Sequence, residues 1–295
     1  MPEPPSDRAK DRMIPSEPDH PKNLRKRKFW RGVYGAFRVL KPVAALLGPQ
    51  YRRSRDWIEI DITYACNLSC YNCNRSVRQA PSGEHVTLEQ IERFIRESVE
   101  KGLRWRRIRL IGGEPTVHPQ LLDFVRVLLE YKRLHSPKML LAIHTNGYGD
   151  KVESVLARLP GEVKIVNTSK TGIENPFYPF NLAPRDSISH HFVDYSMGCR
   201  VPEQCGTGLT PFGYYPCAIA GGIDRVLGLD IGRKRLPHKK DRMAEELREL
   251  CQWCGNFRRG GFNKWSDTVD REVMSRSWKE VYKRYRQRRP KLTRY

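Results

Sequence analysis

The chain has 295 residues, a net charge of +21 and eight cysteines. The excess charge lies at the two ends, because residues 1–55 carry fourteen Lys and Arg against five acids and residues 256–295 carry thirteen against four. This distribution excludes a uniformly basic molecule. Residues 56–255 keep only +3 and hold every cysteine, so the large net charge says little about the chemistry of the cysteines.

The N-terminal arm divides into two parts. Residues 1–28 are rich in Pro, Asp and Glu before a basic run at 25–28, and we expect a disordered basic arm there. Residues 29–50 interleave apolar residues with Arg31, Arg38 and Lys41, which predicts an amphipathic helix. These charges and Pro42 exclude a simple membrane span. The helix could lie on an anionic bilayer or pack against the rest of the chain, and packing is the simpler alternative.

Strands and helices are expected to alternate from residue 57 to residue 167. Apolar runs predict strands at 57–63, 107–111, 139–144 and 163–167. A capping box, Thr87 to Gln90, opens a helix that ends at Gly102, and further helices are expected at 119–132 and 152–159. Residues 190–196 are a candidate for one more strand. The alternation predicts an α/β fold with a parallel sheet, whose site lies at the carboxyl ends of the strands.

Three cysteines follow the first strand with the spacing C-x3-C-x2-C: Cys66, Cys70 and Cys73. A structural zinc site or a fully ligated [4Fe-4S] cluster takes four protein ligands, so this loop leaves one metal position for another group. A zinc knuckle with a distant fourth ligand and packing thiols are the alternatives. The second strand ends in Gly112-Gly113-Glu114-Pro115, which by itself is an ordinary turn.

Together, in this order, the two motifs resemble those of the radical S-adenosylmethionine enzymes. The resemblance implies a partial (β/α)6 barrel in which Cys66, Cys70 and Cys73 hold three irons of a [4Fe-4S] cluster, while the fourth iron binds the amino and carboxylate groups of S-adenosylmethionine. It also implies that the backbone of 112–115 approaches the methionine end and that Glu114 neutralises its ammonium group. The family usually has an aromatic residue before the third cysteine, where this chain has Asn72, so the contact with adenine is in doubt.

Polar residues after the third and fourth strands are candidates for further contacts with the cofactor. We select Asn146, Asn167 and Ser169, although ordinary turn chemistry explains each of them equally well. His118 and His144 receive no role, because a lone histidine is more often structural.

The region from 197 to 260 holds the other five cysteines. Residues 205–217 predict a hairpin that ends in a cysteine, and Cys251-Gln252-Trp253-Cys254 is a chelating pair at the end of a helix. The region resembles the auxiliary cluster region of the SPASM and twitch subgroups, although its spacing departs from theirs, and this implies one auxiliary [4Fe-4S] cluster. We expect the ligands Cys205, Cys217, Cys251 and Cys254, with Cys199 as the substitute for Cys205. A zinc ribbon on the same residues is the alternative, and disulfides are not expected.

The remaining boundaries follow from composition. Residues 51–196 are expected to form the partial barrel, 197–260 the auxiliary region and 261–295 a basic, helical C-terminal tail. A helix over 267–289 would suit either docking onto the barrel or contact with nucleic acid.

The function implied by the resemblance is reductive cleavage of S-adenosylmethionine to a 5′-deoxyadenosyl radical that abstracts hydrogen from a substrate. A small metabolite, such as a sugar or a phosphorylated compound, is expected as the substrate, and a flavodoxin- or ferredoxin-like protein as the electron donor. Radical modification of a peptide or RNA, and a non-catalytic iron–sulfur or zinc protein that binds nucleic acid, stay open. With no signal peptide recognised, the expected location is the cytoplasm, with anionic membrane or nucleic-acid contact through the basic arms as an option.

Overall fold

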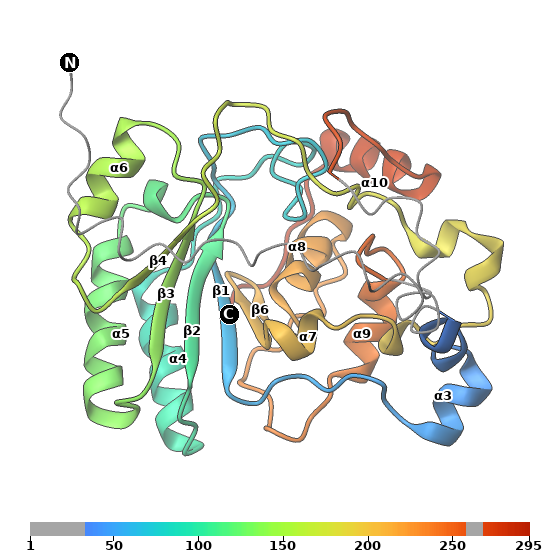
Figure 1. Cartoon of the computed structure of the whole chain (residues 1–295), viewed down its shortest axis with the longest axis horizontal. Coiled ribbons are helices and arrows are strands. Elements are labelled where there is room, and N and C mark those ends of the chain that lie inside the picture. The colour runs from blue at the N-terminus through green and yellow to red at the C-terminus, as the bar shows by residue number, and fades with distance from the viewer. Residues whose placement is uncertain (1–32, 258–267) are drawn as a thin grey trace, which may run out of the picture.

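A six-stranded sheet forms the centre of the molecule, for which the computed structural model describes residues 33–257 and 268–295 (Figure 1). The strand order is β4-β3-β2-β1-β5-β6, and all neighbours are parallel except β5 and β6. The strands are β1 (Trp57–Thr63), β2 (Arg107–Gly112), β3 (Leu140–Thr145), β4 (Lys164–Asn167), β5 (Thr207–Thr210) and β6 (Gly213–Tyr215). The expected α/β architecture with a parallel sheet is confirmed.

Three helices cover one face of β1 to β4: α4 (Leu88–Glu100), α5 (Leu121–His135) and α6 (Asp150–Ala157). Alternate residues of β1, Ile58, Ile60 and Ile62, are buried in the same apolar cluster as Phe94 and Phe124 of the helices. The residues between them point to the opposite face. The capping box of α4 is present as predicted, since the Thr87 hydroxyl accepts from Gln90 N and the Gln90 side chain accepts from Thr87 N.

The prediction of a strand within residues 190–196 is wrong. That segment consists of the 3-10 turns η4 (Ile188–His190) and η5 (Tyr195–Met197), and Val193 makes a single bridge to Leu40. The place beside β1 is taken instead by β5, with Ile58 opposite Thr207. The sheet therefore continues past the expected boundary at residue 196, because the edge of β1 pairs with the hairpin that leads to Cys217.

A second group of helices packs beside β5 and β6: α7 (Val201–Gln204), α8 (Ala218–Leu227), α9 (Ala244–Cys251) and α10 (Arg276–Gln287). The C-terminal helix is shorter than expected, and Val269 instead bridges to Phe177. Trp278, Tyr282 and Tyr285 of α10 are buried in a cluster with residues of α8. Docking, one of the two expected roles of this helix, is what the structure shows.

The segment expected to be one helix over 29–50 is divided where the structure describes it. Residues 33–38 are helical, and α3 (Lys41–Leu47) begins again with Pro42 in its first turn. Proline cannot donate the backbone hydrogen bond that a continuous helix needs, which explains the division. Val39 and Ala44 are buried against Val193. Within residues 33–257 and 268–295, no helix has both the length and the apolar character needed to cross a bilayer.

Candidate functional site

The cysteine loop and the Gly-Gly-Glu-Pro turn are joined by backbone hydrogen bonds at the carboxyl end of the sheet. Gly113 N donates to Thr63 O at 2.7 Å, and Glu114 N donates to Ala65 O at 2.9 Å. A Cβ on Gly112 would lie 2.2 Å from Thr63 O, and one on Gly113 would lie 2.1 Å from Ala65 O. Gly112 also has a φ of 138°, which favours glycine. Both glycines therefore let the second strand approach the segment just before Cys66.

The three thiols of this loop lie near one another. Burial raises the pKa of the Cys66 thiol to about 12, and the nearby groups of Cys73, Glu114 and Cys70 add to this effect. Cys66 Sγ is 3.9 Å from the Asn146 side-chain nitrogen and accepts from Leu68 N at 3.4 Å. A metal would have to displace protons from such thiols, since metal ligation requires thiolates.

Glu114 is fully buried and braces the ends of two strands. Its carboxylate accepts from Thr116 N at 3.1 Å, from the Thr145 hydroxyl at 2.9 Å and from Asn146 N at 2.8 Å. The side chain has no exposed surface, so a contact with a ligand ammonium would require the residues that cover it to move. This arrangement gives Glu114 a positioning role that the sequence analysis missed, and its contact with the cofactor stays a prediction. Pro115 begins the short 3-10 turn η2 (Pro115–Val117) that follows.

Of the polar residues expected near the cofactor, Asn146 lies at the cysteine loop. Its side-chain nitrogen donates to Asn67 Oδ1 at 2.7 Å, and its side-chain oxygen accepts from Tyr148 N. Asn167 Oδ1 instead accepts from Ser169 N at 2.7 Å, within an ordinary turn in which Ser169 has a φ of 48°. Lys170 N donates to Asn146 O, which holds that turn against the end of β3.

Asn72, at the position where an aromatic residue was expected, contacts the C-terminal part of the chain. Its side chain donates to Arg271 O and accepts from Val273 N, both at 2.8 Å. The residue is buried and has a φ of 54°, which asparagine adopts more readily than an aromatic residue. Tyr71 points to another partner, donating to Glu174 at 2.6 Å. Neither side chain is thus positioned as the expected stacking group.

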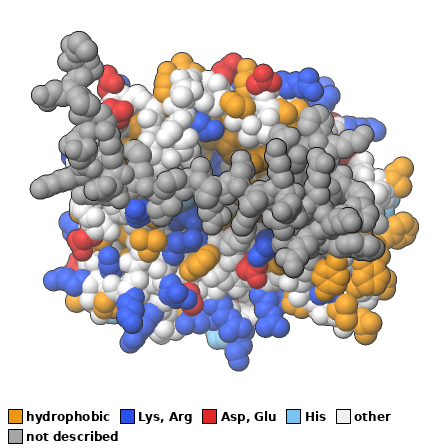
Figure 2. All heavy atoms as spheres, in the orientation of Figure 1, with side chains coloured by type: hydrophobic (Ala, Val, Ile, Leu, Met, Phe, Trp, Pro, Cys, Tyr) orange, Lys and Arg blue, Asp and Glu red, His pale blue; other side chains and the backbone are white. Residues whose placement is uncertain are grey.

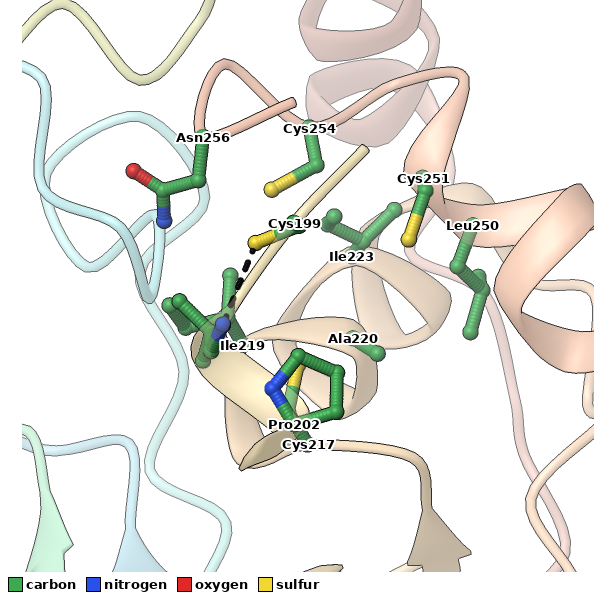
Figure 3. Close-up of a pocket in the computed structure, with 11 residues that line it drawn as sticks. Cys199, Pro202, Cys217, Ile219, Ala220, Ile223, Leu250, Cys251, Cys254 and Asn256 are labelled. Atoms are coloured by element: carbon green, nitrogen blue, oxygen red, sulfur yellow. Dashed lines mark hydrogen bonds between the residues drawn. The ribbon is translucent and has the colours of Figure 1, made fainter. Parts of the chain in front are cut away.

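A second cysteine cluster lines a pocket beside α8. Figure 3 shows four cysteines around it, together with apolar walls from α7, α8 and α9: Cys199, Cys217, Cys251 and Cys254. Cys217 directly precedes α8, and Cys251 ends α9. Burial raises the pKa of Cys254 to about 12, and the nearby thiol of Cys199 adds to this effect. Four thiols with apolar walls are a donor set that suits an iron–sulfur cluster.

Cys205, the expected fourth ligand, does not line this pocket. It ends the turn of α7 and lies 3.9 Å from Arg109 Nη1. Its pKa is raised to about 12 by burial and by the charge of Glu59. Cys199, the expected substitute, occupies the pocket wall in its place. All eight cysteines are among the described residues, and no disulfide joins any of them.

Charged side chains occupy the face of the sheet opposite α4 and α5. Arg75 bonds to Asp61 at 3.1 Å and lies 3.7 Å from Glu59, which is also bonded to Arg109. Burial, with the charges of Arg109, Arg107 and Arg75, lowers the pKa of His144 to about 3. This group was not predicted from the sequence, although acids alternate with isoleucines along β1 and so mark its second face.

His118 is structural. Its ring nitrogens bond to Val86 O at 2.9 Å and to Gln120 N at 3.0 Å, and burial lowers its pKa to about 4.

Among the described residues, no three His, Cys, Asp or Glu side chains are already placed to hold a metal ion.

The geometry agrees with the match of residues 60–176 to the model of the Radical SAM superfamily. Over these residues the chain is similar to this superfamily, whose enzymes use a [4Fe-4S] cluster and S-adenosylmethionine. The matched residues include Cys66, Cys70, Cys73 and the Gly-Gly-Glu-Pro turn.

The curated relatives cover part of the chain. GTP 3′,8-cyclase of Nautilia profundicola is 32% identical over 146 residues, which are 49% of this chain and 43% of the relative. Molybdenum cofactor biosynthesis protein 1 of Bos taurus is 32% identical over 108 residues, which are 36% of this chain and 16% of the relative. The chain thus spans less than half the length of these relatives.

Solved structures show a looser likeness. BtrN in complex with AdoMet and 2-DOIA is 18% identical with a TM-score of 0.42, over 72% of this chain and 98% of that one. Streptococcus suis SuiB bound to precursor peptide SuiA is 21% identical with a TM-score of 0.28, over 42% of this chain and 26% of that one.

Proposed function

We propose that this chain cleaves S-adenosylmethionine reductively and abstracts hydrogen from a small metabolite. The observation that carries the proposal is the joining of the three-cysteine loop to the Gly-Gly-Glu-Pro turn at the carboxyl end of the sheet. When bound, the [4Fe-4S] cluster supplies the electron that splits S-adenosylmethionine into methionine and a 5′-deoxyadenosyl radical, which takes a hydrogen atom from the substrate. An external flavodoxin- or ferredoxin-like protein would provide that electron.

The chain's own residues would hold and orient these groups. Cys66, Cys70 and Cys73 would ligate three irons and leave one for S-adenosylmethionine. The close approach of Gly112 and Gly113 to the segment before the cysteine loop supports a place for the methionine end there. Asn146, close to Cys66 Sγ, is a candidate for a polar contact with the bound cofactor.

We further propose one auxiliary [4Fe-4S] cluster on Cys199, Cys217, Cys251 and Cys254. Their arrangement around the pocket supports it, as does the apolar wall that would keep water from the cluster. Cys205 is left out of this ligand set, because it lies at the end of α7 beside Arg109 and Glu59 and does not line the pocket.

The substrate proposed is a small, oxygenated and negatively charged compound, such as a phosphorylated metabolite. Arg109 Nε is buried without a hydrogen-bond partner among the described residues, and His144 shares the same face of the sheet. A buried donor of this kind favours an acceptor supplied by the ligand. The name of the relative GTP 3′,8-cyclase agrees with a small phosphorylated substrate.

Product analysis tests the chemistry. The anaerobically reconstituted full chain, given dithionite and S-adenosylmethionine, should release 5′-deoxyadenosine, and the Cys70→Ala variant should not. Release of 5′-deoxyadenosine by Cys70→Ala would contradict the proposal. Candidate substrates, phosphorylated and unphosphorylated in matched pairs, can then be screened in deuterated form for transfer of deuterium into 5′-deoxyadenosine.

A further inference from the structure

Six large apolar side chains near α3 are exposed, which is unusual for residues beside a folded core. Leu46 is 84% exposed, Ile188 81% and Phe192 72%. Tyr34, Phe37 and Leu47 are each more than half exposed. Figure 2 shows hydrophobic side chains gathered at the lower right, where Figure 1 places α3. We call these six residues the apolar patch.

Hydrogen bonds hold the parts of the apolar patch together. Arg38 donates to Gly48 O at 3.0 Å, which brings the helical residues 33–38 beside the end of α3. Lys41 N donates to Phe192 O at 2.9 Å, which brings the loop containing Ile188 and Phe192 to the start of α3. The patch is therefore a fixed surface built from two segments that are distant in the sequence.

Packing alone does not explain this surface. The segment contributes Val39 and Ala44 to a buried cluster with Val193, and this cluster anchors it to the molecule. Leu46 and Leu47 point away from that cluster, since both are mostly exposed. A helix that only packed against the body would direct its leucines inwards and its alanine outwards.

The sequence that contains the helical segments of the patch is positively charged. Residues 21–55 contain eleven Lys and Arg and no Asp or Glu. In the sequence, the run 25–28 is separated from Val33 by four residues. On the other side, Asp194 is 3.6 Å from Arg248 of α9, and Asp186 accepts from Ser277. The acids that flank the loop with Ile188 and Phe192 are thus engaged elsewhere.

We propose that the apolar patch docks the protein onto the surface of an anionic lipid bilayer. Apolar side chains that enter the headgroup region beside basic residues are the arrangement of peripheral membrane proteins. A nucleic acid would leave the leucines unburied, and a second copy of this chain would bring two strongly positive ends together. The proposal is independent of the radical chemistry, because none of its residues belongs to either cysteine cluster.

Vesicle binding tests the proposal. The reconstituted full chain should sediment with phosphatidylcholine vesicles that contain phosphatidylglycerol, bind pure phosphatidylcholine vesicles at least about tenfold more weakly, and lose affinity as salt is raised. The double variant Leu46→Ser/Leu47→Ser should bind the anionic vesicles about tenfold or more weakly. Both substitutions are at exposed positions, and an unchanged thermal unfolding curve verifies the fold.

Matched variants separate the patch from general hydrophobicity. Leu134→Ser/Leu229→Ser changes two exposed leucines away from the apolar patch and should leave vesicle binding unchanged. Equal binding of the patch variant and the wild type would overturn the proposal. It would also be overturned if the wild type ignored vesicles but formed a dimer that Leu46→Ser/Leu47→Ser dissolves, or bound duplex DNA in a manner that this variant abolishes.

Discussion

At the scale of single residues, the position of each cysteine in the fold separates two clusters and one outlier. Cys66, Cys70 and Cys73 share one loop, while Cys199 meets Cys217, Cys251 and Cys254 across the pocket. Cys205 lies at the end of α7, beside Arg109 of β2. A distance of only a few residues along the chain therefore decides which thiol faces the pocket.

Iron analysis should distinguish Cys199 from Cys205. The reconstituted wild type is expected to hold about eight iron atoms, and Cys199→Ala should fall towards about four because the auxiliary cluster loses a ligand. Cys205→Ala is the matched control and should keep the full content. The opposite result, with iron lost only in Cys205→Ala, would restore the assignment made from the sequence.

His118 should make stability depend on pH. Its pKa falls from 6.5 to about 4 on folding, so the unfolded state binds the proton first. Neutral His118 therefore contributes fully to the free energy of unfolding above about pH 6.5. This contribution is lost as the pH falls towards 4, by an amount on the order of 2–3 kcal/mol. Urea unfolding of the cluster-free protein at pH 7.5 and 5.0 measures this loss.

His118→Gln should flatten the dependence of the unfolding free energy on pH, and His135→Gln, at an exposed position of α5, is the matched control. A steep loss that persists in His118→Gln would assign the effect to another group.

At the scale of elements, local signals predicted the strands and helices from β1 to β4 because each obeys its own periodicity. The capping box that opens α4 is the sharpest of them, since Thr87 and Gln90 satisfy each other's backbone donors. Gln90 also donates to Pro211 O and Tyr295 O, which ties α4 to the β5–β6 turn and to the C-terminus. One cap therefore serves both a helix and a tertiary contact.

Thr87→Ala should lower the free energy of unfolding by about 1 kcal/mol, because Gln90 N loses its acceptor. Chemical denaturation monitored by circular dichroism measures the change. Thr171→Ala, at an exposed loop position, is the control and should have no effect. No loss in Thr87→Ala would mean that the cap is replaced by water at no cost.

At the scale of the whole molecule, the C-terminal helix stabilises the cysteine loop. Ser76, three residues after Cys73, bonds to the Tyr282 hydroxyl at 2.7 Å, and that hydroxyl donates to Asn181 at 2.7 Å. Arg225 of α8 donates to Arg75 O and Ala80 O, both at 2.9 Å. The loop that would hold the first cluster is thus supported by residues from three later parts of the chain.

Tyr282→Phe should therefore destabilise the fold by about 1–2 kcal/mol, since two buried polar partners lose their hydrogen bond. It should also lower the yield of the first cluster, measured as iron bound in a Cys254→Ala background. Tyr178→Phe, at an exposed position, is the matched control for both measurements. Unchanged stability and iron content would show that α10 does not support the loop.

The sequence by itself determined the alternating strands and helices from β1 to β4 and the resemblance of residues 60–176 to the Radical SAM superfamily, because these depend on periodicity and on spacing within a few residues. Only the tertiary structure decided that β5 joins β1, that Cys199 rather than Cys205 faces the pocket, that Glu114 braces two strands and that Asn72 contacts the C-terminal segment. These outcomes depend on contacts between residues far apart in the chain, whose positions are set by the packing of the sheet against α8 and α10 and not by any local pattern.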